Sequence, residues 1–201
     1  MEPLTSHLGK VLPLRRSDVD TDQIIPSEYC RRLTKTGYED ALFARWREQP
    51  DFVLNDPARA GGTILVAGAN FGTGSSREHA VWALRDWGIA AVIAPSFGDI
   101  FRRNALKNGL LVASLPEDDV AHLMARAEQD VSYEITVDLQ ECTVRWPEGQ
   151  RGFEIDSRAR SLLLDGLDDI AMTLERQDDI SDYESGRPGW LPTFSPAGGV
   201  S

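Results

Sequence analysis

The sequence predicts an α/β fold with a parallel-strand core and additional antiparallel strands. Two observations carry this prediction. Between residues 63 and 129, short apolar runs typical of buried strands alternate with stretches whose apolar residues recur at helical spacing. From residue 132 onward, polar and apolar residues alternate one by one, which is typical of antiparallel strands with one buried face.

The first 62 residues predict short elements. A strand is expected over residues 8–14, and the apolar pair Ile24–Ile25 indicates a second, short strand that Pro26 ends. We expect the side chains of Asp20-Thr21-Asp22 to close the turn before it onto backbone N–H groups, rather than to hold a divalent metal ion. Residues 27–38 indicate a mobile basic loop, and residues 39–48 an amphipathic helix.

The remaining elements follow from the same patterns. In the core, strands are expected over residues 63–67, 90–94 and 110–115, and helices over residues 77–87, 99–107 and from Pro116 to about Gln129. Antiparallel strands are expected over residues 132–139, 142–146 and 152–155. Two more helices are expected over residues 157–164 and 167–179. We expect one domain over residues 1–184 and a loose tail, rich in proline, glycine and serine, over residues 185–201.

The composition is that of a globular protein large enough to bury a core. The 201 residues are 41% hydrophobic and 26% charged. The net charge of −11 argues against general affinity for nucleic acid or for a membrane surface. Neither an N-terminal signal segment nor a membrane-spanning window is evident, so a cytoplasmic protein is expected. Its two cysteines, Cys30 and Cys142, are too few to ligate an iron–sulfur cluster or a structural zinc ion, so we expect no metal on this chain.

The stretch from Asn70 to Ala80 joins a predicted strand to a predicted helix. Its glycines, Gly72 and Gly74, permit a tight turn and a close approach of a ligand to the backbone. Free N–H groups at the helix start, together with the guanidinium of Arg77, would bind a small anion. A structural interpretation also fits, because Ser75 and Glu78 have the spacing of a capping box. No lysine follows the glycines, which argues against a nucleotide-binding P-loop.

Six segments of the chain occur in an order that is specific to one family. They are residues 19–26, 34–38, 50–55, 71–80, 94–101 and 166–171. Together they resemble the small subunits of 3-isopropylmalate dehydratase, and the resemblance covers most of the chain, from about residue 8 to residue 180. The element Gly-Thr-Gly-Ser-Ser-Arg-Glu-His, residues 72–79, resembles by itself the swivelling domain of the aconitase superfamily.

This resemblance implies a swivelling β/β/α domain that forms one half of a heterodimeric hydro-lyase. This chain would bind no cofactor, and a large subunit would bring a 4Fe–4S cluster whose open iron acts as a Lewis acid on the departing hydroxyl. The reaction would interconvert 2-isopropylmalate and 3-isopropylmalate through 2-isopropylmaleate, in leucine biosynthesis. Two alternatives stay open: a small subunit for methylmalate/citraconate or homoaconitate, and a non-catalytic subunit that senses a dicarboxylate.

The resemblance also assigns the site residues. Ser75 would act as the base, in its alkoxide form, which requires strong stabilisation of the oxyanion. Substrate would be bound by Gly74, Ser76 and Arg77, and its far carboxylate by Arg32 and Lys35 of the basic loop. Residues bordering or supporting the site would be Asp20, Thr21, Asp22 and His79. Because one hydroxyl cannot both cap a helix and reach a substrate, the sequence leaves open whether Ser75 is base or cap.

Overall fold

The structure, a computed structural model, describes residues 2–191. The chain divides into two compact units, Met1–Leu167 and Asp168–Ser201. The described part of the second unit contains two short helices, α7 (Asp169–Leu174) and α8 (Gln177–Ser185), in place of the single helix expected over residues 167–179. Of the tail expected over residues 185–201, residues 192–201 lie outside the described residues. The expectation of one domain over residues 1–184 stays a prediction.

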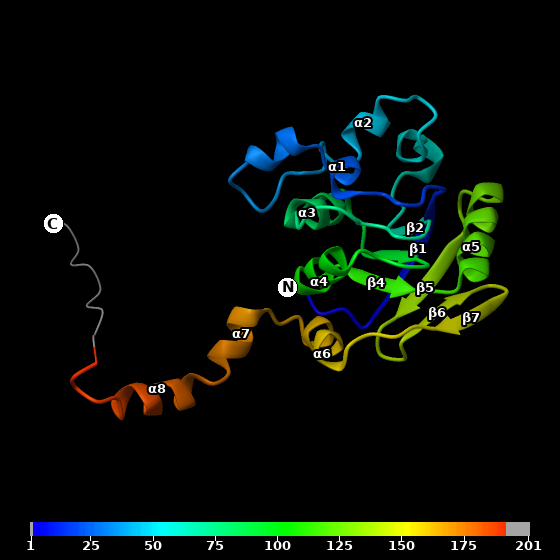
Figure 1. The fold of residues 1–201 in the computed structure, drawn as a ribbon. Helices are drawn as coiled ribbons and strands as arrows, with labels where there is room; N and C mark the ends of the chain where they lie inside the picture. The colour runs from blue at the N-terminus through cyan, green and yellow to red at the C-terminus, as the bar shows by residue number, and fades with distance from the viewer. Residues whose placement is uncertain (1, 192–201) are drawn as a thin grey trace. The chain divides into compact units, whose positions relative to one another are not determined.

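The first unit is built on a seven-stranded sheet in the order β4–β3–β2–β1–β5–β6–β7 (Figure 1). Strands β1 to β4 are parallel to one another, whereas β1–β5, β5–β6 and β6–β7 pair antiparallel. This arrangement confirms the predicted α/β fold. The strands are β1 (Ser6–Leu14), β2 (Ile64–Ala67), β3 (Ala91–Ala94), β4 (Leu111–Ser114), β5 (Glu134–Asp138), β6 (Thr143–Trp146) and β7 (Gly149–Gly152). Strand β7 comes three residues earlier than the strand expected there.

Strand β1 is shared between the two halves of the sheet. Its residues 6–10 pair with β5, with Ser6 opposite Asp138, whereas residues 11–14 pair with β2, with Val11 opposite Ile64. No other described strand has one parallel and one antiparallel neighbour. The strand therefore joins the parallel core to the antiparallel extension.

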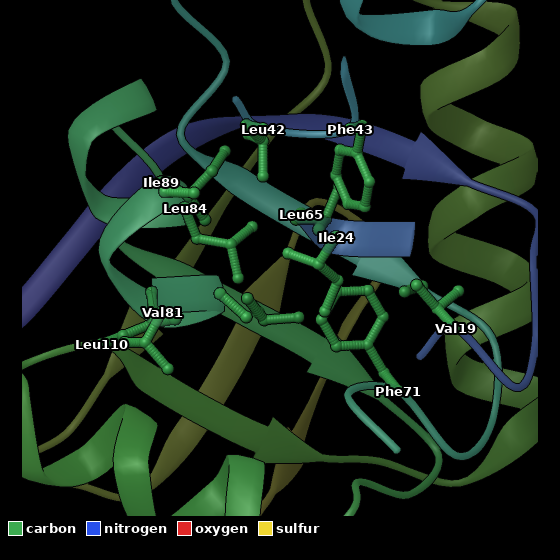
Figure 2. Packing of buried hydrophobic residues seen from close by; sticks show 14 of the residues in the cluster. Val19, Ile24, Leu42, Phe43, Leu65, Phe71, Val81, Leu84, Ile89 and Leu110 are labelled. Carbon is green, nitrogen blue, oxygen red and sulfur yellow. The ribbon is translucent and has the colours of Figure 1, made fainter. Parts of the chain in front are cut away.

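Helices cover both faces of the parallel strands. One face packs against α3 (Glu78–Trp87) and α4 (Asp99–Lys107), and the other against α5 (Glu117–Gln129). Alternate strand residues therefore enter two separate apolar clusters, as expected for a sheet buried on both sides. Figure 2 shows part of the first cluster, including Leu65 of β2, Leu84 of α3 and Phe71 of the loop between them. A further helix, α6 (Ser157–Asp165), places Leu163 in the second cluster.

The segment between β1 and β2 differs from the prediction. The expected strand at Ile24–Ile25 is wrong, because residues 21–24 form a one-turn helix, α1 (Thr21–Ile24). The helix expected over residues 39–48 is shorter, α2 (Ala44–Arg47). Phe43 lies in the left-handed region at φ +47° and donates its backbone N–H to Ile24 O at 2.7 Å, so helical bonding cannot extend back through it. Single 3₁₀ turns occupy Ser27–Arg31, Val53–Asn55 and Pro57–Arg59.

We expect Gly72→Ala to destabilise the chain by about 2–4 kcal/mol, from left-handed strain and overpacking together. Gly72 has φ +75°, and a Cβ there would lie 2.2 Å from Cγ of Phe101, whose side chain is buried. Gly61 is a matched control, because its φ is +76° and a Cβ would meet nothing within 4 Å. Gly61→Ala should therefore cost about 1 kcal/mol. Denaturant unfolding measures both, and equal costs would contradict close packing at Gly72.

Candidate active site

The loops that follow β1, β2 and β3 meet at the carboxyl edge of the parallel strands. Backbone hydrogen bonds join the first two, from Gly72 N–H to Val19 O at 2.7 Å and from Thr21 N–H to Thr73 O at 3.0 Å. The second and third are joined by Phe71 N–H to Ser96 O at 3.0 Å. Open α/β sheets bind ligands at this edge. The stretch from Asn70 to Ala80 therefore lies where the fold class places a site.

Ser75 does not cap the helix that follows it. Helix α3 begins at Glu78, and its N-cap is Arg77, with extended backbone at φ −78° and ψ 108° and no side-chain capping hydrogen bond. The Ser75–Glu78 capping box is therefore absent, and Ser76 does not replace it. The Ser75 side chain instead places Oγ 2.9 Å from Oγ1 of Thr21, in an exposed residue. The hydroxyl of Ser75 is therefore exposed and has no capping role.

Thr21 is the buried neighbour of Ser75. It is 2% exposed and is the one buried polar or charged residue among those described. It is also the first residue of α1, whose N-cap is Asp20. The Asp20 carboxylate accepts from Gln23 N–H at 2.8 Å, and Gln23 Oε1 accepts from Asp20 N–H at 2.9 Å. This confirms the expected turn closure for Asp20. The expectation is wrong for Thr21 and Asp22, whose side chains bond to the Ser75 and Arg77 side chains instead.

Arg77 is held by Asp22. Its Nη1 donates to Oδ1 of Asp22, and this bond raises the pKa of Arg77 above its ordinary value. In the part of the chain that the structure describes, Asp22 is the only hydrogen-bond partner of this guanidinium. The remaining N–H donors can therefore take a carboxylate side by side, as arginine often does. The Arg77 side chain is 25% exposed, so solvent and a ligand can reach it.

Gly74 precedes Ser75 and lies against the first turn of α1. Its φ is +93°, and a Cβ there would lie 3.5 Å from Asp20 Cβ and 3.6 Å from Thr21 Oγ1. The glycine thus keeps the backbone open beside Ser75 in a conformation that other residues rarely adopt.

His79 belongs to a group of aromatic rings one turn into α3. Its ring centroid lies 4.7 Å from that of Trp82 and 5.6 Å from that of Tyr38. Burial lowers the pKa of His79, which favours the neutral imidazole. These contacts favour support of the α3 start over direct proton transfer, and its place at the site border stays a prediction.

The two basic residues assigned to the far carboxylate differ in their surroundings. Arg32 forms a two-pronged ion pair with Asp40, with both N–O distances at 2.7 Å, and lies over the Tyr29 ring at 5.1 Å. Lys35 is exposed and makes no hydrogen bond or ion pair within residues 2–191. Within the described residues, neither side chain forms a hydrogen bond with Ser75, Thr21 or Arg77, so their substrate contacts stay predictions.

Several partners at this edge were not visible in the sequence. Thr21 and Ser75 are 54 residues apart, and Asp22 and Arg77 are 55 apart, so no local pattern pairs them. Cys30 lies near Arg77 and Asp22, and burial raises the pKa of its thiol while Arg77 lowers it. The sequence marked only the two segments that take part, residues 20–22 and 75–77, because each carries polar residues directly after a predicted strand or turn.

The described residues do not fit an iron–sulfur cluster. No group of three or more His, Cys, Asp or Glu side chains among residues 2–191 is arranged to hold a metal ion. The two cysteines are free and lie on different elements, one near α1 and one between β5 and β6. No step of the chemistry is therefore assigned to a metal on this chain. Within the same residues, every helix is too short or too polar to cross a membrane.

Comparison with known proteins gives consistent matches over nearly the whole chain. Residues 1–118 match the family model of the aconitase C-terminal domain, and residues 121–157 match the model described as LeuD_N. A 3-isopropylmalate dehydratase small subunit from a Parafrankia species is 58% identical over 96% of this chain and 99% of its own length. The small subunit from Acidothermus cellulolyticus is 57% identical over 96% and 98%.

A solved structure shares the fold. The crystal structure of a 3-isopropylmalate dehydratase from Methanocaldococcus jannaschii aligns with a TM-score of 0.66 at 29% identity, covering 88% of this chain and 98% of that chain. The relatives are named small subunits, which implies a large-subunit partner. These matches confirm the resemblance found in the sequence. The chain belongs to the family of 3-isopropylmalate dehydratase small subunits.

Proposed function

We propose that this chain is the small subunit of a hydro-lyase that interconverts 2-isopropylmalate and 3-isopropylmalate through 2-isopropylmaleate, in leucine biosynthesis. Relatives that carry the dehydratase name are 52–58% identical over at least 96% of the chain. The observation that carries the mechanism is the position of Ser75, which is exposed at the carboxyl edge and is not engaged as a helix cap.

The reaction requires a proton to leave a carbon next to a carboxylate. Negative charge then develops on the carboxylate oxygens, and fixed donors at that position stabilise the transition state. Arg77 supplies such donors, because Asp22 fixes one end of its guanidinium and leaves N–H groups unused. The first turn of α3 adds backbone N–H groups that no side chain caps, with the positive end of the helix dipole.

In this proposal Ser75 takes the proton. A serine hydroxyl is a weak base, so it has to act in its deprotonated form, with hydrogen-bond donors directed at its oxygen. A non-catalytic sensor of dicarboxylates would need no exposed hydroxyl beside the arginine. The presence of both Ser75 and Arg77 at one edge therefore favours the enzyme.

The partner supplies the rest of the site. Departure of the hydroxyl needs an acid, and we assign that role to the large subunit, which we propose carries the 4Fe–4S cluster. Gly74, Ser75 and Ser76 are exposed to solvent in the single chain, which agrees with a site that is completed by a second subunit.

We expect the isolated chain to be inactive and the complex with the large subunit of the same organism to be active. The test is co-expression and purification of the two chains, followed by assay with 2-isopropylmalate and 3-isopropylmalate. Each chain alone serves as the control. Turnover by the small subunit alone would contradict the two-subunit proposal.

The substrate is tested in the same complex. Methylmalate, citraconate and homoaconitate are assayed beside the isopropylmalates, because related enzymes for these acids would share the Ser-Ser-Arg element. A kcat/KM higher for one of them than for 3-isopropylmalate would contradict the proposed substrate while leaving the reaction class in place.

A further inference from the structure

The hydroxyl of Thr21 has one hydrogen-bond partner within residues 2–191, and that partner is Ser75. The two oxygens lie 2.9 Å apart. Thr21 is 2% exposed, so water does not compete for its hydroxyl. Buried hydroxyls are costly unless they are paired, which means that the Thr21 hydroxyl stays directed at Ser75 Oγ.

The backbone around Thr21 fixes the hydroxyl in place. Thr21 N–H donates to Thr73 O at 3.0 Å, and Thr21 O accepts from Ile25 N–H at 3.0 Å. The Asp20 capping box holds the turn in front of it. Because threonine is branched at Cβ, its side chain has few rotamers. The loop of Ser75 and the start of α1 are therefore held together both by backbone bonds and by this hydroxyl pair.

The direction of the hydrogen bond depends on the protonation state of Ser75. When both hydroxyls are neutral, either oxygen can donate to the other. Once Ser75 has lost its proton it has nothing to donate, so Thr21 has to be the donor. The bond then becomes charge-assisted, and such bonds are about twice as strong as neutral ones. Pairing with Thr21 thus favours the deprotonated form of Ser75 over the neutral form.

We propose that Thr21 is a positioning residue that donates a hydrogen bond to deprotonated Ser75 and so favours its action as the base. This inference rests on the proposed function, since it acts through Ser75. Its role differs from that of Arg77, which faces the substrate. A loss of this donor should slow turnover and leave substrate affinity nearly unchanged.

The test uses the assembled two-subunit enzyme. Thr21→Val removes the hydroxyl and keeps the side-chain shape, and it should lower kcat by about 30-fold while KM changes less than about threefold. Thr21→Ser keeps the hydroxyl and should stay within about fivefold of the parent enzyme. Thr63→Val is the matched control, because the Thr63 hydroxyl lies 2.7 Å from His7 Nε2, before β2 and away from Ser75. It should change kcat less than about twofold.

Three results would overturn the proposal. They are a Thr21→Val enzyme with kcat close to that of the parent, a Thr21→Ser enzyme as slow as Thr21→Val, and a loss in Thr21→Val that appears in KM alone. Thermal melting and binding to the large subunit are measured for every variant, and Thr21→Ala replaces Thr21→Val if the latter does not assemble. If Ser75→Ala keeps its activity, the proposed function fails. If Ser75→Ala is inactive and Thr21→Val is not impaired, only this inference fails.

Discussion

Ser75→Ala should lower the kcat of the assembled enzyme by about 10³-fold or more, because removal of a positioned base costs up to about 10⁴-fold. The chain should still fold, since the Ser75 side chain is exposed and caps no helix. The variant leaves the buried Thr21 hydroxyl without its partner, which should lower the free energy of unfolding by about 1–3 kcal/mol. The measurement is steady-state turnover of 3-isopropylmalate by the purified complex, with binding to the large subunit determined in parallel.

The control for this variant is Ser132→Ala. Ser132 lies before β5 and bonds only to Asp130 within the described residues, so its removal should leave turnover unchanged. Near-normal turnover by Ser75→Ala would mean that the base lies elsewhere. Loss of partner binding together with activity would instead show that Ser75 belongs to the subunit interface and not to the chemistry.

Arg77→Lys should lower kcat/KM by about 100-fold, the second-largest effect. A lysine ammonium is a single point charge and cannot take a carboxylate with two parallel N–H donors, each worth about 1.5–3 kcal/mol when charged groups are involved. It would also have to choose between Asp22 and the substrate, whereas the guanidinium can hold both. The loss should appear in KM and in kcat, because the carboxylate gains charge in the transition state. Initial rates over a range of substrate concentrations separate the two.

Arg151→Lys provides the comparison. Arg151 of β7 pairs with Asp119 of α5 at 2.6 Å, and within the described residues it makes no hydrogen bond to Ser75, Thr21 or Arg77. Lysine keeps the positive charge beside Asp119, and Arg151 is not bonded to the site residues, so this variant should retain parental kinetics. An Arg77→Lys enzyme with an unchanged kcat/KM would remove Arg77 from the substrate site.

Much of the core could be predicted from sequence, because it depends on local periodicity. Helix α4 has the predicted bounds, and the apolar runs at residues 63–67 and 90–94 contain β2 and β3. These strands are buried on both faces, so an unbroken run of apolar residues marks them clearly. The end of α3 at Gly88 was also predictable, because a glycine in the left-handed region, here at φ +103°, commonly ends a helix.

Elements set by distant contacts could not be predicted in this way. Ile24 and Ile25 have strand-like side chains, yet the Asp20 capping box and the contact with Phe43 turn that segment into a helix. The Ser75–Glu78 spacing fits a capping box locally, but Ser75 lies against Thr21, 54 residues earlier in the chain. Tertiary contacts of this kind override local propensity. The site residues were found from the family resemblance, and their pairing was visible only in the structure.

The division of β1 between two neighbours has a consequence for the order of folding. The strand is synthesised before residues 64–67 and before residues 134–138, which are the two segments that it pairs with. Its apolar residues Val11, Leu12 and Leu14 therefore stay unpaired on the nascent chain until β2 appears, and residues 6–10 wait until β5 appears. Pairings between such distant segments form slowly and leave strand edges open to aggregation in the meantime. Since β1 leads into Thr21, the contact between Thr21 and Ser75 depends on the pairing of residues 11–14 with β2, whose following loop carries Ser75.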